Sequence, residues 1–177
     1  VAQVQQEPRG LLRISCPVTL AHTVLSTVFA QFLVRYPQVE LEVEVSNRVV
    51  DPVADGIDVA LRVRSTLSDS ASYIVKRLGE TGSILVAQPA LLALFEPVRG
   101  PTDLLKLPTV AMSARQGQNE WELYGPDGAS LTITHRPRYM ASDLLTLREG
   151  VEQGIGVGIL PDYMCCEALQ AGRLVSD

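Results

Sequence analysis

Lysine is scarce in this chain of 177 residues: only Lys76 and Lys106 occur, and 15 Lys and Arg stand against 20 Asp and Glu, for a net charge of −5. Proteins bind duplex nucleic acid mainly through clustered Lys and Arg side chains. We therefore expect that this chain alone does not bind a phosphate backbone. Long apolar runs are missing too, which excludes an obvious membrane span. Residues 1–8 are polar and rich in glutamine, unlike a secretory signal.

Cysteine and histidine are also few. The three cysteines, Cys16, Cys165 and Cys166, are an odd number without a Cys-x-x-Cys pair, and His22 and His135 are isolated. This pattern excludes a disulfide scaffold and a structural zinc site, and it favours a reducing, cytoplasmic setting. No nucleophile elbow or His-Glu-x-x-His motif occurs. We therefore expect a protein that is not an enzyme and that carries neither metal nor cofactor.

The composition is that of a globular protein, with 46% hydrophobic and 20% charged residues. Its length fits one domain or two small lobes. The first third alternates strands and helices: a strand over 11–15, a helix over 20–36 with a 3.6-residue apolar period, a strand over 39–45, a short helix over 51–56 and a strand over 57–63. The near-continuous apolar run of the last of these predicts a strand covered on both faces. The order β-α-β-α-β indicates an α/β fold with parallel strands.

The second half begins a new β/α unit, so we expect two lobes. Expected strands cover 73–78, 83–87, 109–112, 138–141 and 155–160. A short helix is expected to begin at Pro89, and further helical segments are expected over 103–106, 143–151 and 162–170. The turn sequence Gly125-Pro126-Asp127-Gly128 predicts a hairpin joining 121–124 to 130–134, with Trp121 as its core residue.

Three glycines, Gly154, Gly156 and Gly158, suggest a nucleotide-binding loop at first sight. The dinucleotide fingerprint, however, follows a strand and opens a helix, whereas this run follows a helix and enters a strand. We interpret the glycines as positions where two backbones approach closely, near a crossing between lobes.

A binding site is predicted at the carboxyl ends of the parallel strands, where loops converge and ligands of open α/β sheets bind. Two of these loops also begin helices, whose N–H groups and dipoles favour an anion. Hydroxyls, an amide and guanidinium groups together suit a small carboxylate. The candidate effector-binding residues are Ser15, Cys16, Pro17, Thr19, Ser46, Asn47, Arg48, Arg62, Arg64, Ser113 and Asp143.

Several of these side chains have a simpler structural explanation. Ser15, Thr19 or Asp143 can cap a helix without touching a ligand. Cys16, near a helix start, could be a redox-sensitive thiolate, but a small packing residue is the simpler interpretation.

The arginines have such an alternative too. Arg48, Arg62 and Arg64 could be solvated or paired with nearby acids such as Asp51 and Asp58. The convergence of the loops, more than any single residue, favours the site.

The chain resembles the effector-binding domain of LysR-type transcriptional regulators over about residues 9–175. Each motif is loose, but their order and spacing together are specific. The motifs include Gly10-Leu11-Leu12-Arg13-Ile14-Ser15-Cys16-Pro17, Arg35-Tyr36-Pro37, Asp55-Gly56-Ile57-Asp58-Val59-Ala60-Leu61-Arg62 and Gly154-Ile155-Gly156-Val157-Gly158-Ile159-Leu160-Pro161.

The resemblance implies a periplasmic-binding-protein-like fold of two α/β lobes joined by crossing strands, with an effector in the interlobe cleft. It assigns residues 1–8 to the remnant of a linker, 9–86 with 160–177 to lobe I, and 87–159 to lobe II. In this family a further strand and helix complete lobe I, so the resemblance implies a first lobe whose C-terminal part is absent. Its cleft-lining segments coincide with the strand ends chosen above.

The function implied is a ligand-sensing domain, forming a homodimer or tetramer, that binds a small organic acid and controls transcription. DNA would be bound only through an N-terminal domain outside this chain, with no membrane involved. Two alternatives stay open: a secreted solute-binding protein of the same fold, and an enzyme on a two-lobed scaffold. The enzyme would need a catalytic Lys, Cys or carboxylate pair, and neither lysine follows a predicted strand end.

Overall fold

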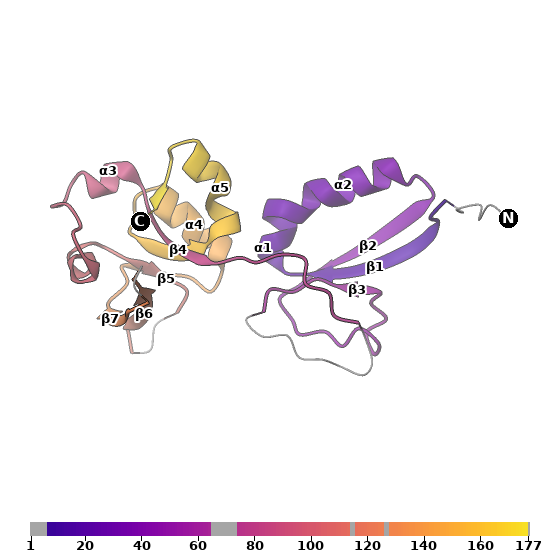
Figure 1. The fold of residues 1–177 in the computed structure, drawn as a ribbon, viewed down its shortest axis with the longest axis horizontal. Coiled ribbons are helices and arrows are strands. Elements are labelled where there is room, and N and C mark those ends of the chain that lie inside the picture. Colours follow the sequence, from indigo (N-terminus) through magenta and orange to yellow (C-terminus); the bar gives the residue numbers. More distant parts are fainter. Residues whose placement is uncertain (1–6, 65–73, 114–115, 126–127, 177) are drawn as a thin grey trace. The chain divides into compact units, whose positions relative to one another are not determined.

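The computed structural model describes residues 7–64, 74–113, 116–125 and 128–176. The chain forms two compact units, Val1–Gly79 (unit 1) and Glu80–Asp177 (unit 2), and each is described by itself (Figure 1).

Unit 1 is built on a parallel sheet in the order β2-β1-β3. Strand β1 (Gly10–Cys16) pairs along its whole length with β2 (Val39–Val45), from Gly10 opposite Val39 to Cys16 opposite Val45. Strand β3 (Val59–Ala60) pairs with β1 on its other side. The alternation of Val and Glu along β2 gives one half-buried face and one wet face, as predicted.

A continuous helix from Val18 to Arg35 connects β1 to β2. It consists of α1 (Val18–Leu20), a π-helical segment η1 (Ala21–Leu25) and α2 (Ser26–Arg35), and it runs along the sheet in Figure 1. Among the described residues it is the one helix whose length and composition would let it cross a membrane. The sequence analysis had expected none. Apolar helices that cover a sheet in water-soluble domains meet the same criterion.

Three expectations for unit 1 and its end are wrong. Residues 51–56 form turns rather than a helix, although Asp51 accepts hydrogen bonds from the backbone N–H groups of Val53 and Ala54 as a cap would. The strand expected over 57–63 is limited to β3, and Val63 is exposed, so no layer covers both of its faces. Residues 74–78 form no strand, and the first residue of that prediction, Tyr73, lies outside the described residues.

Unit 2 has a sheet with packed layers on both faces. Its order is β10 (Val175–Ser176), β4 (Ser83–Ala87) and β9 (Gly158–Pro161), and both pairings are antiparallel. Alternate residues of β4 point to opposite faces. Val86 joins the cluster formed with α4 (Leu144–Glu152) and α5 (Asp162–Gln170), whereas Ala87 joins a second cluster with α3 (Pro89–Leu92) and η2 (Pro101–Lys106).

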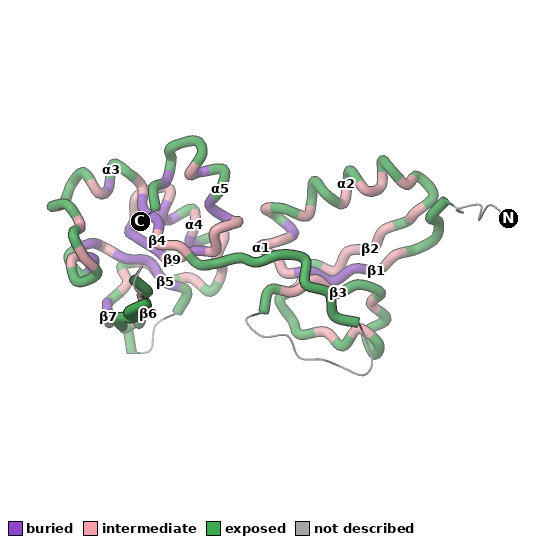
Figure 2. The backbone as a smooth tube through the Cα atoms, in the orientation of Figure 1, coloured by how far each residue is buried: buried purple, intermediate pink, exposed green. Residues whose placement is uncertain are grey.

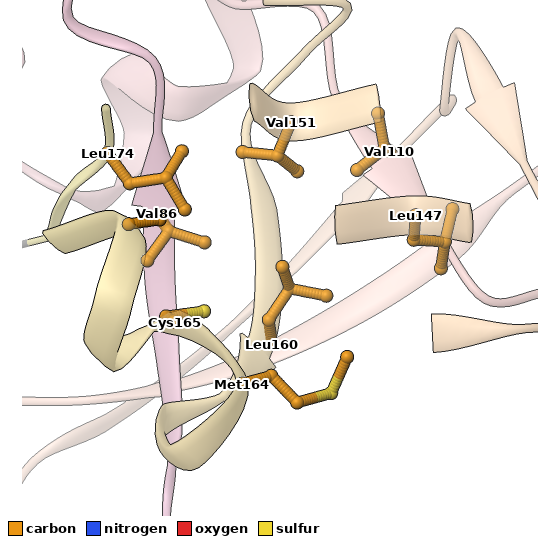
Figure 3. Packing of buried hydrophobic residues seen from close by; sticks show 9 residues of the cluster. Val86, Val110, Leu147, Val151, Leu160, Met164, Cys165 and Leu174 are labelled. Atoms are coloured by element: carbon orange, nitrogen blue, oxygen red, sulfur yellow. The ribbon is translucent and has the colours of Figure 1, made fainter. Parts of the chain in front are cut away.

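The first cluster is the best-packed part of the described chain. Figure 3 shows side chains from β4, α4, β9 and α5 converging on one another, with Val151, Leu160 and Cys165 almost completely buried. Two predicted helices are therefore confirmed: the one over 162–170, and, within one residue, the one over 143–151. Their apolar stripes face this sheet.

Two smaller pairings complete unit 2. Strand β5 (Val110–Ala111) pairs in parallel with β8 (Tyr139–Met140). The predicted hairpin is confirmed: β6 (Asn119–Tyr124) and β7 (Ser130–His135) pair antiparallel, and Trp121 is buried opposite Ile133.

The glycines of the 154–158 run lie where other parts of unit 2 approach closely: backbone at Gly156, and side chains at Gly154 and Gly158. A Cβ at Gly156 would lie 2.8 Å from the carbonyl oxygen of Pro108, and one at Gly158 would lie 2.8 Å from Val110. The interpretation as a close approach of two backbones is confirmed at Gly156, because a Cβ there would collide with the backbone of Pro108 and Thr109. Its position near a crossing between lobes stays a prediction.

The division into lobes stays a prediction. In this chain residues 160–176 pack inside unit 2, through pairing of β9 and β10 with β4, whereas the family resemblance assigns them to lobe I.

Candidate functional site

The parallel register of unit 1 brings the carboxyl ends of its three strands together. The backbone N–H of Ser46 donates to the carbonyl of Cys16 (2.9 Å), and the N–H of Leu61 donates to the carbonyl of Ser15 (2.8 Å). Residues that follow each strand therefore meet at one edge of the sheet, as the sequence predicted. We call the set Ser15, Pro17, Thr19, Ser46, Asn47, Arg48 and Arg62 the strand-end cluster.

Arg62 is the centre of this cluster. Its Nη2 donates to the hydroxyl of Ser15 at 2.7 Å and, more weakly, to the carbonyl of Arg48 at 3.3 Å. Its Nη1 donates to its neighbour's carbonyl, that of Leu61, at 2.6 Å. All three acceptors are neutral oxygens, and among the described residues no carboxylate pairs with Arg62. Within residues 7–64, 74–113, 116–125 and 128–176 this half-buried guanidinium therefore has no carboxylate at ion-pair distance, and the charge of Glu44 acts on it only from further away.

Arg48, by contrast, is committed to acids. Its guanidinium lies 3.4 Å from Glu44 and 3.4 Å from Asp55, and both carboxylates raise its pKa. Pairing with an acid, one of the two alternatives for the arginines, therefore applies to Arg48, with different partners from those expected. Asp58 instead accepts a hydrogen bond from the backbone N–H of Arg13.

The start of the helix after β1 is held by a side chain from another strand. Asn47, following β2, accepts a hydrogen bond from the N–H of Val18 at 3.1 Å. Ser46 accepts one from the N–H of Arg48, which shapes the same loop. Sequence reasoning assigned both residues to the ligand, but these contacts show that they also build the loop.

Burial separates the candidate residues into two groups. Ser15 and Cys16 have no exposed surface and Thr19 is 8% exposed, whereas Arg48 and Arg64 are exposed and Arg62 is intermediate. Ser15 supports Arg62 rather than capping a helix. A ligand on this edge of unit 1 would therefore meet the arginines before it met the buried Ser15, Cys16 and Thr19.

The pKa shifts of Cys16 and Arg62 agree with this difference in burial. Burial raises the pKa of the Cys16 thiol, while the charge of Arg62 opposes the shift. Burial also lowers the pKa of Arg62; Cys16 and Glu44 act against this shift, whereas the charges of Arg64 and Arg48 add to it. Cys16 is thus a protonated, buried thiol, which supports the packing interpretation over the redox one.

The two candidates in unit 2, Ser113 and Asp143, follow the paired strands β5 and β8 and lie near the same sheet edge. Asp143 caps α4: its carboxylate accepts hydrogen bonds from the N–H and the hydroxyl of Thr146, both at 2.8 Å. Ser113 is exposed, and its carbonyl accepts a hydrogen bond from the amide of Asn119. Asp143 directly precedes α4, and in unit 1 Pro17 directly precedes α1, so two of the candidate loops begin helices, as predicted.

One polar side chain escaped the sequence analysis. His135, treated there as isolated, is buried against Trp121 and hydrogen-bonded to Thr109. The signal was present: Ile133 and His135 are two residues apart on one strand, so they share its inner face.

The comparisons with known proteins agree on one family. The family model for the LysR substrate binding domain matches residues 5–176. This chain belongs to that family. As a LysR substrate-binding domain it has the periplasmic-binding-protein-like fold of mixed helices and strands expected from the resemblance.

Its relatives are transcriptional regulators. The chain is 31% identical over 167 residues to the HTH-type transcriptional activator AaeR of Escherichia coli K12, covering 94% of this chain and 53% of AaeR. It is 30% identical over 175 residues to the HTH-type transcriptional regulator PtxR of Pseudomonas aeruginosa, covering 99% of this chain and 55% of PtxR. The chain thus spans about half the length of these relatives.

Solved structures give the same result. The full-length Vibrio cholerae virulence activator AphB matches with a TM-score of 0.78 and 28% identity, covering 96% of this chain and 56% of AphB. CrgA of Neisseria meningitidis, a LysR-type regulator, matches with a TM-score of 0.80 and 21% identity, covering 98% of this chain and 57% of CrgA, and it supports the fold alone.

Proposed function

We propose that this LysR substrate-binding domain senses a small organic anion at the strand-end cluster of unit 1. The observation that carries the proposal is Arg62: a half-buried guanidinium at the carboxyl ends of parallel strands, bonded to neutral oxygens. A carboxylate would supply the negative partner that the described residues do not, and charge-assisted hydrogen bonds contribute about 1.5–3 kcal/mol each.

Thr19 would complete the site. It lies in the first turn of the 18-residue helix Val18–Arg35, where the helix dipole favours negative charge. Arg64 and Arg48 would add positive potential at the rim, while Ser15 would keep Arg62 in place. Ser113 and Asp143, which follow β5 and β8 of unit 2, stay predicted effector-binding residues on the family resemblance.

The regulatory role follows from the family. Binding of the anion would shift the balance between two arrangements of a homodimer or tetramer, and so change how an N-terminal domain outside this chain binds DNA. We propose that this happens in the cytoplasm and without any chemical conversion of the ligand.

Calorimetric titration with a panel of aromatic and aliphatic carboxylic acids, each with its neutral amide, tests the ligand class. We expect at least one acid to bind and its amide not to. Arg62→Lys should weaken binding about tenfold or more, because lysine is a single-point donor without the forked geometry of arginine. Thr19→Ala should lose a similar amount if its hydroxyl contacts the ligand.

Arg13→Lys is the matched control. Arg13 lies on β1 and pairs with Glu42 on the wet face, so the same change there should leave affinity unaltered. Thermal melts of all variants check folding. Equal binding by wild type, Arg62→Lys and Thr19→Ala would refute the site, and binding of neutral compounds alone would refute the ligand class.

A gel-shift assay tests the assignment of DNA binding. With a net charge of −5 and two lysines, this chain is expected to show no sequence-selective retardation of duplex DNA at physiological salt. Sequence-selective binding of DNA by this chain would contradict the proposal that DNA is bound only through an N-terminal domain outside it.

A further inference from the structure

The last residue of β7, His135, is a buried titratable side chain outside the strand-end cluster. It is 6% exposed, and its ring lies 4.1 Å from that of Trp121, centroid to centroid, with the planes tilted by 47°. Trp121 in turn belongs to the apolar cluster with Leu104 and Leu107, next to η2. The imidazole is therefore part of the surface by which the β6–β7 hairpin packs on unit 2.

Only one nitrogen of this ring is satisfied. Nδ1 lies 2.6 Å from the hydroxyl of Thr109, and Nε2 is buried without a hydrogen-bond partner among the described residues. In either neutral tautomer one interaction with Thr109 forms and Nε2 stays alone, as a donor or as an acceptor. The neutral ring tolerates this arrangement at a modest cost.

A protonated ring would not. Both nitrogens would carry hydrogens, and a positive Nε2–H would be buried without a hydrogen-bond acceptor among the described residues. Trp121 and His135 occupy the inner face of the hairpin, so the acidic residues of β6 alternate onto its exposed face. On η2, Asp103 is bonded to Lys106 at 2.7 Å and to the backbone N–H of Arg99. The charged groups on β6 and η2 are Glu120, Glu122, Asp103 and Lys106, and Arg136 and Arg138 lie in the segment that follows β7.

No described charge compensates the buried ring. Burial alone lowers the pKa of His135 from its ordinary value of 6.5. A group with a lowered folded-state pKa stabilises the fold fully above its unfolded-state pKa. That stability is lost as the pH falls through 6.5 toward the folded-state pKa.

We propose that His135 makes the packing of the β6–β7 hairpin sensitive to acid: one proton taken up by its imidazole drives Nε2 toward water and loosens the hairpin from η2 and the cluster around Leu104. The hairpin is the part of unit 2 that responds, because Trp121 and Ile133 hold it to that cluster. The proposal is independent of the strand-end cluster, which lies in unit 1.

Trp121 is the chain's only tryptophan, so its fluorescence reports on this contact directly. Emission is followed in the full chain from about pH 8 to pH 5, the range in which histidine changes charge. We expect a reversible transition below pH 6.5. It should persist in His22→Gln, the matched control at the chain's other, exposed histidine, and disappear in His135→Gln.

Two-dimensional NMR of the wild-type imidazoles is the second measurement, and it does not depend on the folding of any variant. With two histidines, His22→Gln assigns both signals. We expect the His135 ring to titrate below pH 6.5, and the backbone amide signals of β6 and β7 to change over the same pH range. For each unit by which its folded-state pKa lies below its unfolded-state pKa, acid should raise the unfolding equilibrium constant about tenfold. Titration at or above 6.5, silent hairpin amides, or a fluorescence transition that survives in His135→Gln would overturn the proposal.

Discussion

Units 1 and 2 bury their sequences in different ways. Unit 1 lays one helix along a sheet, and α2 has no buried residue. Among the described residues of unit 1, burial is confined to the carboxyl end of β1 and to Thr19 and Ala21 at the start of the helix that follows (Figure 2). Unit 2 places a sheet between two apolar clusters, one with α4 and α5 and one with α3, η2 and the hairpin. Burial in unit 1 is therefore concentrated at the strand ends, whereas burial in unit 2 is distributed through a core.

The buried polar groups follow the same division. Among the described residues of unit 1, the buried polar residues are Ser15 and Thr19. Both belong to the strand-end cluster, and Ser15 is bonded to Arg62. In unit 2 they are Thr109 and His135, bonded to each other inside apolar surroundings. The comparison teaches that unit 2 carries the larger share of apolar stability, and unit 1 the polar arrangement suited to a ligand.

Truncating the core of unit 2 should have the largest effect. Leu160→Ala removes a side chain that is 1% exposed, and it is expected to lower the free energy of unfolding of unit 2 by about 2–5 kcal/mol through lost burial and a cavity. Val28→Ala on α2, a side chain that is 48% exposed, should cost less than about 1 kcal/mol. Urea unfolding of both variants measures the difference, and equal losses would break the comparison.

The cysteines allow the two units to be compared in one protein. Burial raises the pKa of Cys165 to about 11, from 9.0, so its thiolate fraction is about a hundredfold lower than that of an ordinary thiol. The exposed Cys166 should react first with a thiol reagent. Under increasing urea, Cys16 of unit 1 should become reactive before Cys165 of unit 2. Mass spectrometry of pulse-labelled peptides gives the order, and the reverse order would contradict the lower stability of unit 1.

Removing the partner of Ser15 should cost unit 1 less than a core truncation costs unit 2. Arg62→Met leaves the hydroxyl of Ser15, which has no exposed surface, without its hydrogen bond, and the expected loss is about 1–3 kcal/mol. Arg13→Met on the wet face breaks an exposed ion pair with Glu42 and should cost at most about 1 kcal/mol. Thermal or urea unfolding compares the pair, and equal stabilities would show that Arg62 does not order the strand ends.

The smallest effect concerns the cap of α4. Asp143→Ala removes the carboxylate that accepts from Thr146, with an expected loss of about 1 kcal/mol confined to unit 2. Hydrogen exchange of the first amides of α4 provides the measurement. If affinity for an organic acid falls as well, Asp143 contributes to the ligand site in addition to its capping role.

Local patterns predicted much of the fold. The alternation of Val and Glu in β2, the 3.6-residue period of the helix after β1 and the turn residues of the β6–β7 hairpin act over a few neighbours, so single segments reveal them. The errors fell on 51–63 and 73–78: residues 51–56 form turns, β3 is limited to Val59–Ala60, and residues 74–78 form no strand. An apolar run cannot reveal whether a layer covers it.

The candidate site divides in the same way. The sequence by itself determined that polar residues follow β1, β2 and β3, and parallel pairing then had to bring them to one edge. Only the tertiary structure decided that Arg62 bonds to Ser15 while Arg48 pairs with Glu44 and Asp55, and that His135 is buried on Trp121. The physical reason is mainly range: side-chain alternation in a strand and the helical period depend on neighbours a few residues apart, whereas the contact of Arg62 with Ser15 joins residues 47 positions apart. Even the short-range pair of Arg48 with Glu44 depends on which way a long side chain turns, and the sequence pattern does not reveal that.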